Sequence, residues 1–67
     1  MISVEKTTRT VVLADHLVRY PETARARCHV ENLARSESIA AIAGDCVSAF
    51  RLRAARLRLQ AAIKEHG

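Results

Sequence analysis

Apolar side chains in the second half of the chain fall on two opposite sides of a predicted helix. On the first side they recur every three or four residues, which is the spacing of one helix face. These residues are Ile39, Ala43, Val47, Phe50, Ala54, Leu57 and Ala61. The second side carries Ala41, Leu52, Ala55, Leu59, Ala62 and Ile63. Because a surface helix ordinarily has one apolar side, this pattern predicts a helix that is buried on both.

The two sides are expected to have different packing partners. The first has heptad-like spacing from Ala43 onward and small residues that let a helix approach closely, so we expect it to pack on the rest of the chain. A chain of 67 residues is marginally stable alone, and two cysteines are too few for a disulfide scaffold. A second copy is then the expected source of stability. The predicted homodimer interface is the second side, namely Leu52, Ala55, Leu59, Ala62 and Ile63.

The first half of the chain predicts two shorter helices. The first ten residues are ambiguous, because the β-branched stretch "TTRTVV" at residues 7–12 could extend as a strand. Residues 1–8 are expected to be flexible or extended. Leu13 and Leu17 share one side of a first helix, which Pro21 ends. The same proline suits the first turn of a second helix of about four turns.

The last helix is expected to dominate the fold. Ser36 or Ser38 can cap its start, and no proline interrupts the chain from there to His66. We favour one long helix, and the sequence leaves open whether it kinks or breaks at Gly44, where Asp45 could cap a fresh start. The predicted fold is all-α: a single domain over residues 1–67, with two or three helices, a long C-terminal helix and a bundle completed by homodimerisation.

The positive charge of the chain is concentrated at its C-terminal end. The net charge is +4, from 11 Lys and Arg against 7 Asp and Glu. Residues 1–50 are balanced, so the excess comes from residues 51–67. Four arginines of the stretch "RLRAARLRLQ" border the second apolar side, Arg51 and Arg58 on one flank and Arg53 and Arg56 on the other. Localised charge of this kind indicates a binding surface, and these four are the predicted partner-binding residues.

The sequence carries no pattern typical of an enzyme or a metalloprotein. Cys28, His29 and Cys46, with His16 and His66, fit no zinc-ligand spacing, so we expect no metal and predict buried, reduced cysteines. There is no phosphate-binding glycine motif and no nucleophile with a plausible base. We expect neither catalytic residues nor a cofactor.

One segment resembles a helix-turn-helix motif. In "SIAAIAGDCVSAF", Ala40, Gly44 and Phe50 have the spacing of that motif, which would make residues 46–58 a DNA-recognition helix. However, Asp45 and Arg53 fall where the motif buries apolar residues. The alternative is a ridge of small residues that lets two helices cross closely.

The favoured function is a small regulatory or inhibitory protein that docks a helical surface onto a macromolecule. A protein partner is favoured because leucines, rather than polar groups, lie at the centre of the basic face. The alternative is a nucleic-acid-binding transcriptional regulator that uses the basic C-terminal helix. A third, weaker option is a small anionic ligand between the arginine flanks of a dimer. Binding to an anionic membrane is the least favoured, because the second apolar side lacks tryptophan and phenylalanine. No apolar run is long enough to span a membrane, and no signal peptide is visible, so a cytoplasmic location is expected.

Overall fold

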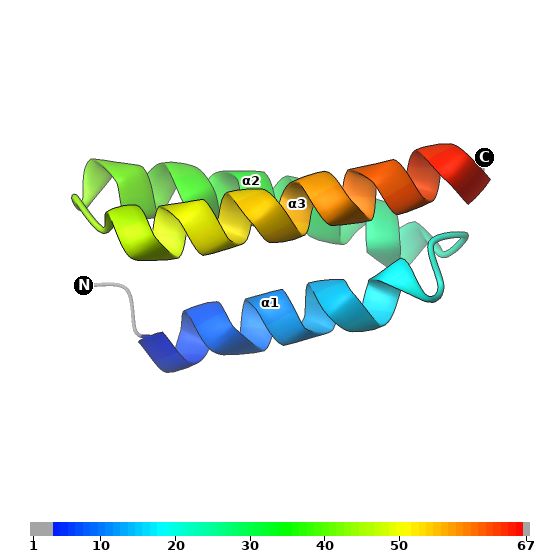
Figure 1. Ribbon diagram of the computed structural model, residues 1–67, viewed down its shortest axis with the longest axis horizontal. Coiled ribbons are helices and arrows are strands. Elements are labelled where there is room, and N and C mark those ends of the chain that lie inside the picture. The colour runs from blue at the N-terminus through cyan, green and yellow to red at the C-terminus, as the bar shows by residue number, and fades with distance from the viewer. Residues whose placement is uncertain (1–3, 67) are drawn as a thin grey trace.

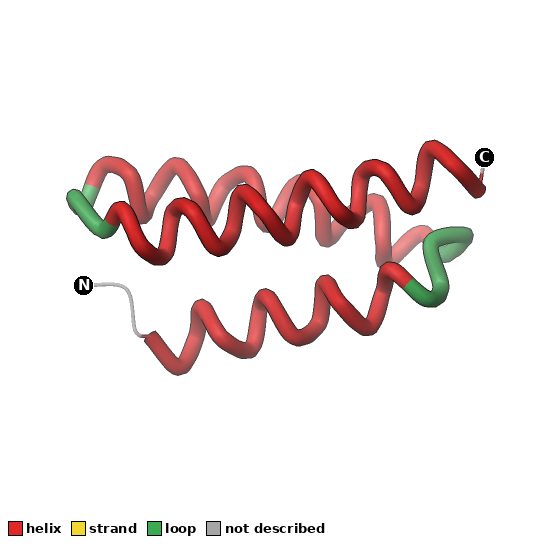
Figure 2. Tube along the Cα trace, in the orientation of Figure 1, coloured by secondary structure: helices red, strands yellow, loops and turns green. Residues whose placement is uncertain are grey.

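A computed structural model describes residues 4–66, which form three helices in an elongated bundle (Figure 1). Helix α1 spans Val4–Val18, α2 spans Ala24–Ile42 and α3 spans Cys46–His66. The bundle measures 35 × 17 × 15 Å. Short loops connect the helices, so α2 runs antiparallel to both α1 and α3 (Figure 2). The all-α prediction is confirmed for the described residues.

The N-terminal segment is helical from Val4 onward, so the extended structure predicted for residues 4–8 is wrong. Residues 1–3 of that prediction lie outside the described residues. Tertiary contacts override the β-branched preference here, because one side of α1 has a place in the core. Thr7, Ala14 and Leu17 are buried on that side.

Helix α2 begins three residues after Pro21, at Ala24. Thr23 caps it: its hydroxyl accepts a hydrogen bond from the Ala26 N–H at 3.2 Å and donates one to the Tyr20 carbonyl at 3.1 Å. Pro21 therefore belongs to the connection rather than to the first helical turn. The two serines expected to start the last helix, Ser36 and Ser38, lie inside α2.

The predicted long C-terminal helix is broken by a tight turn at residues 43–45. Gly44 adopts a positive φ of 78°, which is typical of the residue after a helix end. Its N–H donates to the Ala41 carbonyl at 3.1 Å, and the Asp45 N–H donates to the Ala40 carbonyl at 2.9 Å. The Asp45 carboxylate then accepts from the Ser48 N–H at 3.1 Å and so caps α3. The prediction of a single helix is wrong, because this turn satisfies the backbone groups at both helix ends.

This turn joins two antiparallel helices that lie side by side (Figure 1). A helix-turn-helix motif instead sets its helices at about 90–120° to each other. The helix-turn-helix interpretation is therefore wrong, and the small residues near the turn belong to a helical hairpin.

Among the residues whose burial the structure describes, the core consists of eight buried apolar residues, four of them alanines, which lets the three helices approach closely. Its members are Ala14, Leu17, Ala26, Leu33, Ala40, Leu52, Ala55 and Leu59. The side of α3 that was expected to face a second copy thus faces α1 and α2. The side expected to pack within the chain, which includes Phe50, is exposed.

The two sides of α3 have exchanged roles for a physical reason. The turn at Gly44 separates Ile39 and Ala43, which precede it, from Val47. The first apolar side is therefore split, and only its residues from Val47 onward lie on α3. On the second side, Leu52, Ala55 and Leu59 all lie on α3 and pack against α1 and α2, with Ile63 beside them. Their burial stabilises the fold through the hydrophobic effect.

Candidate functional site

The solvent-facing side of α3 is apolar. We call Val47, Phe50, Ala54, Leu57 and Ala61 the exposed α3 face. Phe50 is 72% exposed, Val47 70% and Leu57 49%. At 100° per residue these side chains lie opposite the core residues of α3, and from Val47 to Ala61 they extend over about 21 Å. The face therefore presents a continuous apolar strip along most of the helix.

Basic side chains border this face on both flanks. Arg51 and Arg58 lie on the flank next to α1, where Arg58 pairs with Asp15 at 3.1 Å. Arg53 lies on the opposite flank, toward α2. The sequence predicts arginines on both flanks of the second apolar side. Because these flanks lie between the two apolar sides of the helix, the same arginines also border the first side, which is the exposed one in the structure.

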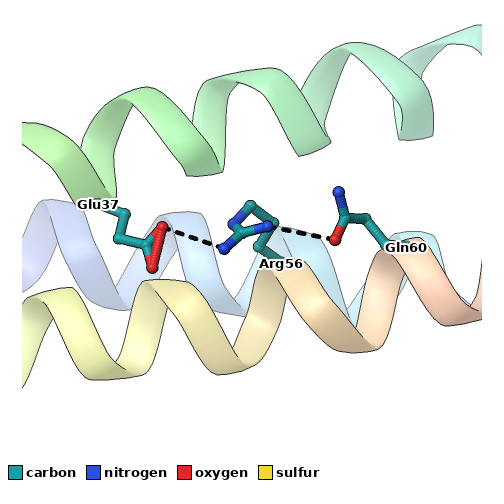
Figure 3. A network of polar contacts seen from close by, with 3 residues as sticks. All are labelled: Glu37, Arg56 and Gln60. Atoms are coloured by element: carbon teal, nitrogen blue, oxygen red, sulfur yellow. Dashed lines mark hydrogen bonds and ion pairs between the residues drawn. The ribbon is translucent and has the colours of Figure 1, made fainter.

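Arg56 is held within the bundle and does not project from it (Figure 3). Its guanidinium lies 3.3 Å from the Glu37 carboxylate of α2, and it donates to the Gln60 amide oxygen at 3.2 Å. The side chains of Arg56 and Glu37 are only 21% and 22% exposed, and the Nε of Arg56 is buried without a hydrogen-bond partner among the described residues. These contacts give Arg56 a structural role in joining α2 to α3.

The Arg58 pair is of a different kind. Both side chains are largely exposed, and the side chain of Arg58 is 65% exposed. Exposed ion pairs contribute little to stability, because solvent screens them and two long side chains must be ordered. Arg58 can therefore exchange Asp15 for another carboxylate at small cost.

Arg51 and Arg53 are exposed and form no ion pair with any described residue. Arg51 lines a shallow hollow between α1 and α3 together with Thr8, Val11 and Val12. Of the four predicted partner-binding arginines, these two have charges that are not neutralised within the bundle.

The residues predicted to form a dimer interface lie in or beside the core of the single chain. Leu52, Ala55 and Leu59 are buried, and Ile63 packs against them, half-buried. Ala62 is half-buried at the edge. A second chain cannot reach the three buried residues while the bundle stays folded.

The histidines and cysteines do not come together. Buried His29 lies with its Nε2 3.0 Å from the Thr10 carbonyl oxygen, so this nitrogen donates a hydrogen bond from α2 to α1. Cys28 and Cys46 are both exposed free thiols, so the prediction of buried cysteines is wrong. No group of three or more potential metal ligands occurs within the described part of the chain.

The sequence contained one signal for the break between α2 and α3. The pair Gly44-Asp45 combines a residue suited to a helix end with a residue suited to a helix start. A helix that starts at Cys46 limits the first apolar side to Val47, Phe50, Ala54, Leu57 and Ala61. Residue spacing alone still leaves open which side of that helix is buried.

Two further properties bear on function: the capacity of the helices to span a membrane, and similarity to known proteins. None of the helices within residues 4–66 combines the length and the apolarity needed to cross a membrane. The chain matches no protein-family model, and searches of curated proteins and of solved structures find no significant match.

Proposed function

We propose that this chain is a non-enzymatic regulatory or inhibitory protein that docks the exposed α3 face onto a protein partner. One observation carries the proposal: Phe50, the only phenylalanine, is 72% exposed in the middle of a regular helix face. Large apolar side chains that gather on an exposed strip commonly mark an interaction site. Aromatic residues are also enriched among the anchors of protein interfaces.

The apolar centre of the face favours a protein over a nucleic acid. A helix that enters a DNA groove presents polar and basic side chains to base edges and phosphates. Here the arginines stand at the flanks, and the centre offers no hydrogen-bonding group to a base. The alternative function as a nucleic-acid-binding regulator rests on Arg51 and Arg53, and the same experiment tests it.

The exposed thiols support one further part of the proposal. Cys28 and Cys46 are free and accessible. Accessible unpaired cysteines suit a reducing compartment, where thiols are kept reduced. We therefore keep the cytoplasm as the proposed location.

The test is capture of partners from a native lysate, with and without nuclease treatment, followed by mass spectrometry. The wild-type chain is compared with the double variant Phe50→Ser, Leu57→Ser. The matched control is Ile42→Ser, which makes the same kind of change at an 88% exposed residue of α2. We expect one protein to be retained by the wild type and the control but lost from the double variant.

Two results would count against the proposal. Equal capture by the double variant would show that the exposed α3 face is not the docking site. Binding that disappears with nuclease treatment would instead support the nucleic-acid alternative.

A further inference from the structure

Resting on the proposed function, we propose that the partner of the exposed α3 face is an amphipathic helix whose apolar side is bordered by carboxylates on both flanks. The face has the geometry that a helix requires, and its border has the charge that attracts carboxylates. A second copy of this chain lacks that charge pattern.

The geometry follows from the spacing of the five apolar residues. Steps of three, four, three and four residues lead from Val47 through Phe50, Ala54 and Leu57 to Ala61. This alternation is the seam along which two helices interlock their side chains. Small Ala54 and Ala61 alternate with larger Phe50 and Leu57, so a partner's side chains find space between the large ones. About four turns of a partner helix would cover the strip of about 21 Å.

The charge expected of the partner follows from the arginines on the two flanks of the exposed α3 face. Arg51 on the α1 flank and Arg53 on the α2 flank have no acidic partner among the described residues. Arg58 adds a third positive group whose pair with Asp15 is exposed. Because positive charge stands on both flanks, a complementary partner needs negative charge on both sides of its own apolar strip. Complementary borders of this kind govern specificity and association rate.

A second copy does not meet this requirement. If two α3 helices packed in parallel with two-fold symmetry, Arg51 of each chain would face the flank that carries Arg53 of the other. In an antiparallel pair, the flank of Arg51 and Arg58 would face itself. Both arrangements place arginine against arginine, and like charges in an interface are unfavourable.

The acidic residue of α3 itself, Glu65, comes into play only in a shifted antiparallel pair. Placing Glu65 against Arg51 of the other chain shifts the centre of the pair toward the C-terminus. That register leaves Val47 and most of the surroundings of Phe50 uncovered. The pair would then lose the most exposed apolar residues of the face, so we expect the isolated chain to be a monomer.

The test uses three synthetic amphipathic helices with the same leucine and alanine strip. They carry glutamate, glutamine or lysine at the positions that border the strip. Binding to the intact chain is measured by fluorescence anisotropy at about 0.02 M and about 0.5 M salt. We expect the glutamate peptide to bind roughly fivefold to tenfold more tightly than the glutamine peptide, as a few exposed ion pairs allow. The lysine peptide should bind most weakly, and high salt should reduce the differences.

Charge reversal supplies the decisive variant. The double variant Arg51→Glu, Arg53→Glu should prefer the lysine peptide over the glutamate peptide. The control Arg27→Glu, Arg35→Glu changes the net charge equally at exposed positions of α2 and should keep the wild-type order. Neither pair of substitutions touches the core, so folding is expected to persist in both.

Each contrary outcome is distinct. If all three peptides bind equally and Phe50→Ser, Leu57→Ser abolishes binding, apolar docking stands and the charge inference is overturned. If the glutamate peptide binds that double variant as well as the wild type, the face is not used and the proposed function fails too. If no peptide binds, the inference of a helical acidic partner is wrong, while the lysate experiment still decides the proposed function.

Three other binding partners of the exposed α3 face or its arginines would each give a different experimental result. A stable dimer in sedimentation equilibrium that Phe50→Ser dissociates would assign the face to a second copy. Tight binding of duplex DNA at physiological salt, unaffected by Phe50→Ser, would assign the arginines to phosphates. Binding to vesicles of anionic phospholipid that Phe50→Ser abolishes would assign the face to a membrane surface. Any of these results would overturn the inference.

Discussion

The carboxylate of Asp45, three residues after the last residue of α2, accepts a hydrogen bond from the backbone N–H of Ser48 at 3.1 Å. The backbone N–H of Asp45 meanwhile donates to the Ala40 carbonyl of α2. One residue thus closes α2 and starts α3. The hairpin that presents the exposed α3 face depends on this turn.

The first prediction concerns pH. Hydrogen bonds from the side chain and the backbone N–H of Ser48 lower the pKa of Asp45 below its ordinary value. A group with a lowered pKa in the folded state stabilises the fold above its unfolded pKa of about 3.9, and this contribution is lost as pH falls through the folded pKa. Asp45→Asn keeps a good helix cap but removes the charge.

We therefore expect the wild type to have a higher Tm than Asp45→Asn near neutral pH. The difference should shrink as the pH falls below about 4. Thermal unfolding followed by circular dichroism across this range measures it. Parallel curves for the two proteins would show that the Asp45 carboxylate does not contribute.

The second prediction concerns Gly44. Its φ of 78° lies in the left-handed region, and an added Cβ would meet no atom within 4 Å. The cost of Gly44→Ala should therefore come from backbone strain alone, at about 1–2 kcal/mol in the free energy of unfolding. Gly44→Asn should cost less, because asparagine tolerates this conformation. Urea unfolding measures both, and an unchanged stability for Gly44→Ala would contradict the observed turn.

The third prediction tests which side of α3 is buried. Leu52 is 1% exposed and Leu57 is 49% exposed, yet both are leucines of the same helix. Leu52→Ala should destabilise the fold by about 2–5 kcal/mol, and Leu57→Ala by well under half as much. If Leu52→Ala does not fold, the milder pair Leu59→Val and Leu57→Val gives the same comparison. The opposite order would restore the assignment made from the sequence.

The fourth prediction separates structural from partner-binding arginines. Arg56→Gln should cost roughly 1 kcal/mol of stability, because it removes a partly buried pair with Glu37 and packed side-chain methylenes. Arg53→Gln should change stability by less than about 0.5 kcal/mol. A double-mutant cycle of Arg56→Gln with Glu37→Gln measures the coupling between the two residues. A coupling of zero would show that the pair is incidental.

Periodicity predicted the all-helical fold and the two apolar sides of the last helix, but not the break between α2 and α3. It did not show which side packs in the core, because residue spacing identifies an apolar face but not the surface that the face contacts. Gly44, in the left-handed region, follows the end of α2 and separates Ile39 from the helix that carries Phe50. The first apolar side is therefore split between two helices, whereas Leu52, Ala55 and Leu59 of the second side all lie on α3 and pack in the core.

The arginines show the same limit. Their sequence positions fixed the flanks on which Arg51, Arg53, Arg56 and Arg58 lie, but not which of them would meet an acid from another helix. Arg56 reaches Glu37 only because α2 folds back alongside α3. Partner binding by Arg56 stays a prediction, but its guanidinium is engaged with Glu37, so the proposed docking rests on Arg51 and Arg53 instead.

The alanines of the core bear on how the sequence can change over evolutionary time. Ala14, Ala26, Ala40 and Ala55 are almost completely buried where the helices approach one another. A larger side chain at any of these positions would wedge two helices apart and reorient the exposed α3 face. Natural variants should therefore hold these positions to glycine, alanine or serine. Positions on the outer side of α2 should drift freely, so the slowest-changing sites would include the smallest side chains in the molecule.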